Sequence, residues 1–189
     1  MPLEATAAPL CARCLAAPPT LDRMRAAVAY GPLARGIALK RKYGRKIALA
    51  RTMARFMAPL RGASAAPIVV PVPLHRRRLW WRGFNQAGLV ATHLGRQWDV
   101  PVEHHLLRRV RSTPPLKGMN AAQRLSAVGG AFATTEGKRS DGRTVILIDD
   151  VLTTGSTAAA CAQALRKAGA ARVELISWTR VVRPSLLMR

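Results

Sequence analysis

The sequence predicts an α/β protein with a doubly wound, mostly parallel sheet flanked by helices and preceded by a short N-terminal arm. Short runs of β-branched and apolar residues alternate with helical patterns, which is typical of parallel strands joined by crossover helices. One run, residues 145–148, is followed by two acids and a hydroxyl-rich turn that opens a helix. The apolar fraction, 49% of 189 residues, is sufficient for one well-formed core.

The first half of the chain contains the arm, two strands and the helices between them. Residues 1–22 are rich in alanine and proline and predict an arm, so the domain itself spans residues 23–189. Residues 25–30 predict a strand that ends at the turn Gly31-Pro32. Residues 33–60 carry a helical pattern interrupted at Tyr43-Gly44, which predicts two helices. Residues 68–73 predict a buried strand that ends in a proline-stiffened turn.

The second half of the chain is expected to contain the strand before the two acids and three further strands. Residues 84–98 predict a helix with Asn85 as its N-cap, and short strands are expected within residues 100–107 and over 131–134. Residues 108–123 begin as an extended loop. The strand at 145–148, a helix over 158–168 and a strand over 172–179 complete the sheet, and Cys161 is expected in the core. Because ligands of such sheets bind beyond the carboxyl ends of the strands, the loops after 73 and 148 and the loop within 108–123 should converge.

Two acids and a hydroxyl-rich turn form the most informative segment. Asp149 and Asp150 follow the strand where it is expected to end, and carboxylates accept hydrogen bonds from sugar hydroxyls. The turn and the helix N-terminus behind it present N–H donors and a positive dipole to an anion. This combination suits a ribose 5-phosphate. The alternative interpretation is an ordinary crossover turn in which Ser156 or Thr157 caps the helix.

Residues 145–157 resemble the signature of type I phosphoribosyltransferases, which bind phosphoribosyl pyrophosphate (PRPP). The resemblance implies that Asp149 and Asp150 are the catalytic pair that holds the ribose, and that Mg²⁺ joins the ligand. It implies that the phosphate lies on the segment Val151, Leu152, Thr153, Thr154, Gly155, Ser156 and Thr157. A leaving pyrophosphate needs donors and cations. The nearest candidates are Arg76, Arg77 and Arg82, with Lys117 and Arg124 on the loop expected to close, and each is also interpretable as part of a solvated face. The turn Pro71, Val72 and Pro73 is expected to line the same PRPP site.

Further short segments resemble one family when they are taken in order. These segments are Cys11-Ala-Arg-Cys14, Lys42-Tyr43-Gly44, Pro71-Val72-Pro73-Leu74, Arg82-Gly83-Phe84-Asn85-Gln86, Thr113-Pro114-Pro115 and the acidic motif. Together they resemble the ComF family of competence-associated, phosphoribosyltransferase-like proteins. The resemblance implies a role in DNA uptake during natural transformation, beside a competence helicase and other DNA-processing proteins.

The chain departs from that family's pattern at three places. The family carries a four-cysteine zinc finger, whereas only the pair Cys11 and Cys14 is present here, so the arm is either a remnant finger or a loose segment with reduced cysteines. Leu116 stands where the family has glutamine after Thr-Pro-Pro. The asparagine expected shortly after Arg124 is absent. The last two departures affect the loop expected to close over the ligand, and they bear on catalysis and not on the fold.

The charge of the chain predicts a polyanionic partner. There are 31 Lys and Arg against 9 Asp and Glu, a formal net charge of +22. Biased base composition would raise glutamate as well as arginine, and glutamate is scarce. Aromatic side chains accompany the basic ones, as in proteins that bind single-stranded DNA. The predicted nucleic-acid residues are Lys40, Arg41, Lys42, Arg45, Lys46, Trp80 and Trp81. Neighbouring side chains point apart, so one of the two tryptophans is expected to be exposed, unless both fold onto the domain.

These observations leave three functions open. The first is a competence protein that binds PRPP with Mg²⁺ and also single-stranded DNA. The second is an active phosphoribosyltransferase acting on an unidentified nucleophile, and the third is a PRPP-responsive regulator without catalysis. The sequence predicts a cytoplasmic location, because it shows neither a signal peptide nor an apolar run of the ~20 residues that a membrane span needs.

Overall fold

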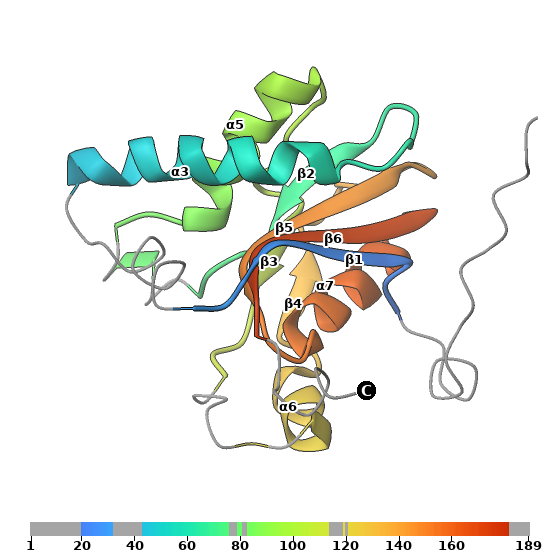
Figure 1. Ribbon diagram of the computed structural model, residues 1–189. Coiled ribbons are helices and arrows are strands. Elements are labelled where there is room, and N and C mark those ends of the chain that lie inside the picture. The colour runs from blue at the N-terminus through green and yellow to red at the C-terminus, as the bar shows by residue number, and fades with distance from the viewer. Residues whose placement is uncertain are drawn as a thin grey trace, which may run out of the picture.

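A computed structural model describes residues 20–31, 43–75, 79–80, 83–113, 119 and 121–181. Its main sheet has four strands, and all three neighbouring pairs are parallel. The order across the sheet is β1 (Arg23–Ala29), β6 (Arg172–Arg180), β5 (Thr144–Leu152) and β2 (Ile68–Pro71) (Figure 1). The predicted parallel sheet is confirmed.

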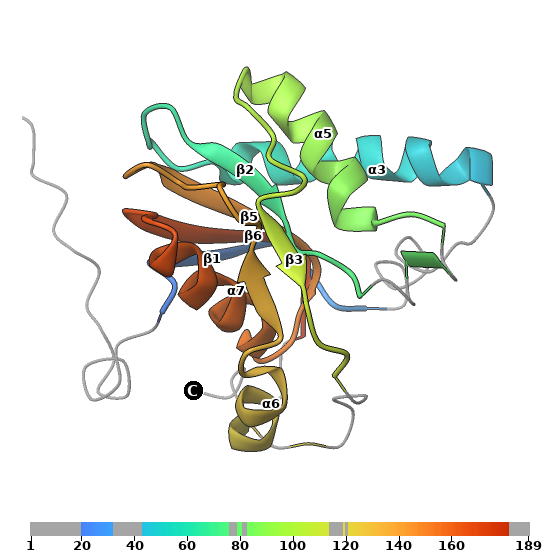
Figure 2. The ribbon, with the colours of Figure 1, turned by 180° about the vertical axis from the view of Figure 1, so that it is seen from behind.

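Helices cover both faces of this sheet, as a doubly wound fold requires. Helices α3 (Tyr43–Met57) and α5 (Gln86–Trp98) lie on one face, and α7 (Ser156–Lys167) lies on the other (Figures 1 and 2). A short 3-10 helix, η1 (Ala58–Leu60), follows α3. The first of the two helices predicted over residues 33–60 lies outside the described residues, as do residues 1–19 with Cys11 and Cys14.

A second, two-stranded sheet lies beside α7. Its antiparallel strands are β3 (Leu107–Arg109) and β4 (Phe132–Thr134), and α6 (Ala121–Val128) precedes β4. The strand predicted within residues 100–107 is therefore wrong in its placement. In that stretch Val102 forms one isolated parallel bridge with Val69 of β2, and the strand begins only at Leu107.

The run at the start of β5 is apolar at every position because both of its faces are buried. Val145 and Leu147 belong to the core under α7, whereas Ile146 and Ile148 belong to the core under α3 and α5. Successive strand side chains point to opposite faces, so a strand between two helical layers needs an apolar residue at each position. Cys161 is fully buried in the α7-side core, as predicted.

The connections that follow β2 and β5 lead toward opposite sides of the sheet. From β2 it passes through α5 to Val102 on the outer side of β2, and from β5 it passes through α7 to β6 on the opposite side. These two connections lie on opposite faces of the sheet. The chain segments that leave the carboxyl ends of β2 and β5 therefore diverge from each other. Such a switch point is where open α/β sheets bind ligands.

Asn85 occupies the N-cap position of α5, but its side chain does not cap that helix. Its Nδ2 instead donates to the carbonyl oxygen of Val72, at 3.1 Å. This bond ties the start of α5 to the residue that follows β2. The predicted cap position is confirmed, and the predicted capping role is wrong.

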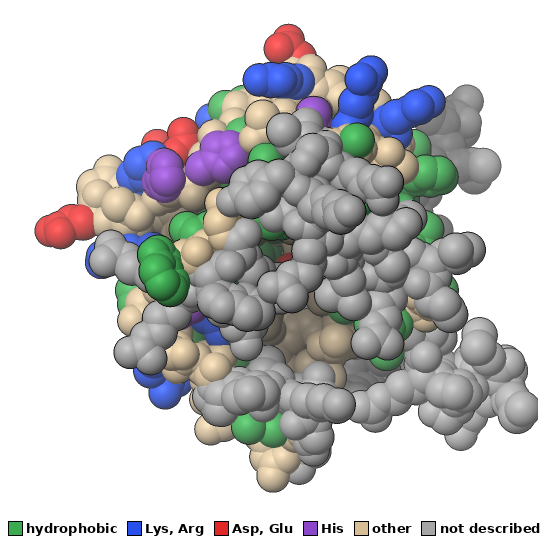
Figure 3. All heavy atoms as spheres, turned by 90° about the vertical axis from the view of Figure 1, so that its left-hand side faces the viewer, with side chains coloured by type: hydrophobic (Ala, Val, Ile, Leu, Met, Phe, Trp, Pro, Cys, Tyr) green, Lys and Arg blue, Asp and Glu red, His purple; other side chains and the backbone are tan. Residues whose placement is uncertain are grey.

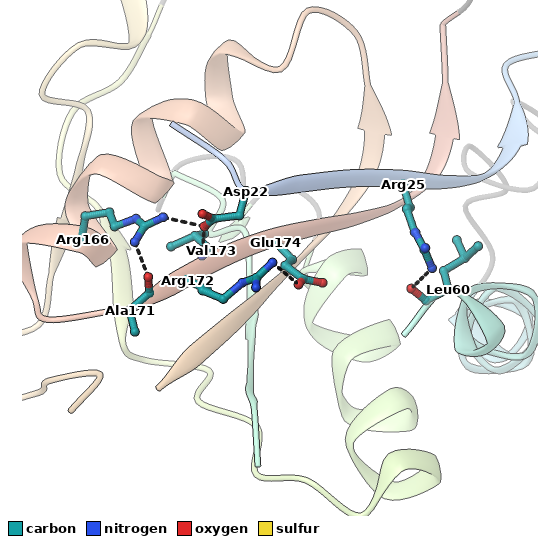
Figure 4. Close-up of polar contacts among 8 residues, drawn as sticks. All are labelled: Asp22, Arg25, Leu60, Arg166, Ala171, Arg172, Val173 and Glu174. Atoms are coloured by element: carbon teal, nitrogen blue, oxygen red, sulfur yellow. Dashed lines mark hydrogen bonds and ion pairs between the residues drawn. The ribbon is translucent and has the colours of Figure 1, made fainter. Parts of the chain in front are cut away.

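At the opposite end of the sheet, where the strands begin, ion pairs and backbone contacts join neighbouring elements (Figure 4). Asp22 accepts from Arg166 at 2.5 Å and from the N–H of Val173 at 2.7 Å, which joins β1, α7 and β6. Arg172 lies 3.6 Å from the buried carboxylate of Glu174. In the part of the chain that the structure describes, no helix has the length and apolar character needed to cross a membrane.

Candidate functional site

The two acids lie within β5 and not after it. Asp149 pairs with Ser177 and Val151 with Thr179 of β6, so the strand continues to Leu152. The prediction that the strand ends before Asp149 is therefore wrong. The cause is unequal strand length, since β2 stops pairing at Pro71 opposite Ile148 while β6 continues. At the two acids, β5 is therefore paired with β6 on one side. On its other side the pairing with β2 has already ended.

The two acids are adjacent and half-buried. Burial raises the pKa of Asp149 well above its usual range, and the neighbouring charge of Asp150 raises it further. The backbone N–H of Asp150, which donates to Asp149 Oδ1 at 2.9 Å, works in the opposite direction. A bound cation or a set of hydroxyl donors would supply the stabilisation that ionised Asp149 lacks.

The turn after β5 presents an uncapped helix end. Gly155 is the N-cap of α7, with φ of 79° and ψ of 0°, and because glycine has no side chain the N-cap residue makes no capping hydrogen bond. The alternative in which Ser156 or Thr157 caps the helix is therefore wrong; Ser156 Oγ instead lies 2.8 Å from Thr154 Oγ1. Free first-turn N–H groups and exposed hydroxyls at Thr153 and Thr154 can bind an anion.

The segment after β2 forms the other wall of the switch point. The N–H of Val72 donates to the carbonyl oxygen of Ile148 at 2.9 Å, so Val72 lies directly beside the acids. Pro71 and Val72 are buried, and Pro73 is half-buried. The side chain of Leu152 is buried on the α7 side, so only its backbone can contribute to a site. The predicted Arg76, Arg77, Arg82 and Lys117 lie outside the described residues.

Arg109 on β3 is a charged residue whose contacts the sequence interpretation did not anticipate. Its guanidinium lies 5.4 Å from the centre of the Phe132 ring and donates to the buried hydroxyl of Thr113, just before the loop that begins at Pro114. Burial raises the pKa of the Cys161 thiol, Asp149 raises it further, and Arg109 opposes both. Asp149 and Arg109 therefore influence the buried Cys161 thiol in opposite directions. One arginine among many gave no sequence signal.

The described residues include three of the predicted nucleic-acid residues: Arg45, Lys46 and Trp80. Trp80 is 87% exposed, which confirms that one tryptophan of the pair projects into solvent. Arg45 and Lys46 lie in the first turns of α3. The remaining predicted residues, Lys40, Arg41, Lys42 and Trp81, lie outside the described part.

The sequence interpretation missed a stripe on α3. Arg51, Arg55 and Phe56 are exposed, and Phe56 is 59% exposed with its ring against Trp178. Figure 3 views the molecule from the side of the strands' carboxyl ends and shows Lys and Arg side chains toward the periphery of this face.

The acid pair fits Mg²⁺ only in combination with a ligand. Among the described residues, no three His, Cys, Asp or Glu side chains are grouped so that they could hold a metal. Carboxylate oxygens are ligands that Mg²⁺ prefers, and Mg²⁺ is commonly held by one or two carboxylates together with substrate phosphates and water. Asp149 and Asp150 would therefore share the ion with oxygens that the ligand brings.

Comparison with known proteins identifies the class to which this fold and site belong. Residues 82–181 match the family described as "Phosphoribosyl transferase domain". The match covers more than half of the chain and includes β5, the acid pair, the turn and α7. The fold is thus that of a phosphoribosyltransferase domain, as the acidic motif predicted.

Curated relatives narrow the class further. The chain is 33% identical over 175 residues to competence protein F of Haemophilus influenzae, covering 87% of this chain and 76% of that protein. It is 33% identical over 172 residues to DNA utilization protein YhgH of Escherichia coli K12, with 87% and 75% covered. Competence protein ComFC of Bacillus subtilis is 36% identical over 104 residues, with 55% and 40% covered. The chain belongs to the ComF family.

Solved structures with a similar shape are more distant. Adenine phosphoribosyltransferase from Thermoanaerobacter pseudethanolicus is 14% identical with a TM-score of 0.46, covering 72% of this chain and 82% of that chain. Glutamine PRPP amidotransferase from Bacillus subtilis is 22% identical with a TM-score of 0.44. That match covers 67% of this chain and only 26% of the amidotransferase.

Proposed function

We propose that this ComF-family protein binds PRPP with Mg²⁺ at the carboxyl edge of its sheet and binds single-stranded DNA through its basic surface. One observation carries the nucleotide part of the proposal. At the switch point, an acid pair whose half-buried Asp149 has a raised pKa lies directly before the N-terminus of α7, where the N-cap residue is Gly155 and makes no side-chain capping bond.

The geometry of the site matches the two ends of a ribose 5-phosphate. Asp149 and Asp150 present acceptors to the ribose hydroxyls, and the turn from Thr153 to Gly155 presents donors to the phosphate. When bound, Mg²⁺ would neutralise the pyrophosphate and the acids together.

Calorimetric titration of PRPP with Mg²⁺ tests this part. The wild-type protein should bind, and the double variant Asp149→Asn/Asp150→Asn should bind at least about tenfold more weakly, because each hydrogen bond to a charged group is worth about 1.5–3 kcal/mol. Asp99→Asn is the matched control, since Asp99 is an exposed acid at the C-cap of α5 in a conformation that asparagine adopts readily. Unchanged affinity in the double variant, or no binding by the wild type, would contradict the proposal.

The DNA part is supported by charge, by an exposed aromatic side chain and by the relatives. The net charge of +22 suits a polyanion, and Trp80 offers a large flat surface on which a base can stack. The stripe of Arg51, Arg55 and Phe56 on α3 offers the same combination. Two relatives are named for competence, and another for DNA utilization.

Fluorescence anisotropy with labelled oligo-dT of about 20 nucleotides tests the DNA part. Affinity should fall linearly with salt on a logarithmic scale, with a slope of about 0.7 per neutralised phosphate. Trp80→Ala should weaken binding by about 1–3 kcal/mol, the usual worth of one stacked base. Leu79→Ala is the control, because Leu79 is its exposed neighbour without an aromatic ring. Salt-independent binding would count against the proposal.

The same reagents separate the two alternative functions. Release of pyrophosphate that depends on an added acceptor would identify an active phosphoribosyltransferase. A change in oligo-dT affinity when PRPP is bound would identify a regulator, because linked sites must influence one another reciprocally.

A further inference from the structure

A groove between β4 and α7 lies apart from the acid pair. It encloses about 260 Å³ and is lined by Gly130, Phe132, Ala133, Thr134, Ala160, Gln163, Ala164 and Lys167. The α7 residues in this lining belong to the middle and the end of the helix, whereas the acid pair lies near its beginning. Figures 1 and 2 both show β4 between β3 and α7, so the groove borders the edge of β4 that faces away from β3.

The register of the small sheet shows that this edge carries unpaired backbone groups. The N–H of Val110 donates to Ala131 and the N–H of Thr135 donates to Leu106, both at 2.9 Å. Hydrogen-bonded pairs alternate along an antiparallel ladder, so Phe132 and Thr134 direct their N–H and C=O groups away from β3. Within the described residues, no backbone group pairs with this edge. Such an edge is a template for another strand.

The side chains around the groove indicate what kind of strand would fit. Ala133, Ala160 and Ala164 are small, which leaves room beside the edge for incoming side chains. Lys167 is exposed in the last turn of α7, and in the described part of the chain no carboxylate lies within ion-pair distance of it. A chain with 31 basic and 9 acidic residues can supply few acids of its own. The groove therefore favours an extended segment with an acidic side chain.

We propose that an extended, acidic segment of a partner protein adds to the free edge of β4, with a carboxylate placed against Lys167. The partner's backbone would pair with the N–H and C=O groups of Phe132 and Thr134, and its alternate side chains would enter the groove against α7. A nucleic acid would also meet Lys167, but its backbone cannot match the alternating donors and acceptors of a strand edge. This surface is additional to the nucleotide and DNA sites proposed above.

Selection from a display library of random octapeptides on the full chain supplies the probe. Enriched peptides should alternate apolar and other residues and should contain at least one acid. One such synthetic peptide should bind about tenfold or more weakly to Lys167→Glu, since like charges then face each other. Thr134→Pro should weaken binding as well, because it removes only the N–H that faces the groove. Arg96→Glu is the matched control, as Arg96 lies in the last turn of α5 on the other face of the sheet.

The alternative outcomes are distinct. Absence of acidic enrichment would overturn the proposal, and so would unchanged affinity for Lys167→Glu. If Thr134→Pro fails to fold, Lys167→Glu decides the result alone, because Lys167 is exposed and its replacement leaves the core intact. Loss of oligo-dT binding in Lys167→Glu, without enrichment of any peptide, would assign the groove to DNA and overturn the proposal.

Discussion

Replacement of Gly155 by alanine should damage the site through the backbone alone. Gly155 has a φ of 79°, in the left-handed region that L residues avoid. A Cβ added there would lie 3.6 Å from Met24 Sδ and 3.7 Å from Leu152 Cδ1, which is ordinary van der Waals contact. The cost is therefore conformational and amounts to about 1–2 kcal/mol. For a domain of this size, that corresponds to a fall in Tm of about 2–8 °C.

The same change should weaken PRPP binding, because relief of the strain rotates the peptide groups that would face the phosphate. Loss of one hydrogen bond to a charged group corresponds to roughly tenfold or more in affinity. Thermal unfolding and calorimetric titration with PRPP and Mg²⁺ measure the two effects separately. Gly155→Asn should recover most of the stability, since asparagine adopts the left-handed conformation more readily than alanine.

Gly169→Ala is the control that separates a loss of stability from a loss of PRPP affinity. Gly169 has a φ of 89°, and an added Cβ would have no neighbour closer than 4.0 Å, but the residue lies after the end of α7. Its replacement should lower Tm by a similar amount and leave PRPP affinity unchanged. The reasoning would be refuted if Gly155→Ala were as stable as the wild type, or if Gly169→Ala lost PRPP binding equally.

Three further changes test the site and its supports. Asp149→Asn should raise Tm at pH 7, because burial and Asp150 raise the pKa of Asp149 and its ionisation therefore opposes folding. The gain should disappear below about pH 4, where Asp149 is protonated in both the folded and the unfolded state. Thermal melts from pH 3 to 8 check this. Gly95→Ala would place a Cβ 2.1 Å from Val102 Cγ2 and should cost about 1–3 kcal/mol in urea unfolding. Adding Val102→Ala should recover part of that loss. Arg109→Met removes the donor to buried Thr113 and should cost about 1–3 kcal/mol by the same measurement; an unchanged midpoint would show that the bond contributes nothing.

Local patterns predicted most of the sheet because each pattern spans only a few residues. The apolar run at residues 145–148 predicted a buried strand, which the structure confirms, and the glycine, hydroxyl and acidic residues after it indicated the motif. The helix over 158–168 was placed to within two residues at its start because its small and apolar residues recur at helical spacing. These features depend on neighbours along the chain.

The sequence by itself therefore determined the fold class, the acid pair with its turn, and the family. Only the tertiary structure decided that Asp149 and Asp150 remain within β5, because that depends on β6 being longer than β2. It also placed Arg109 against Phe132 and Thr113 and, within the described residues, left one edge of β4 unpaired beside α7. The physical reason is range: turn, strand and helix preferences act over a few residues, whereas strand ends, charge neighbours and free edges follow from contacts between segments far apart in the sequence.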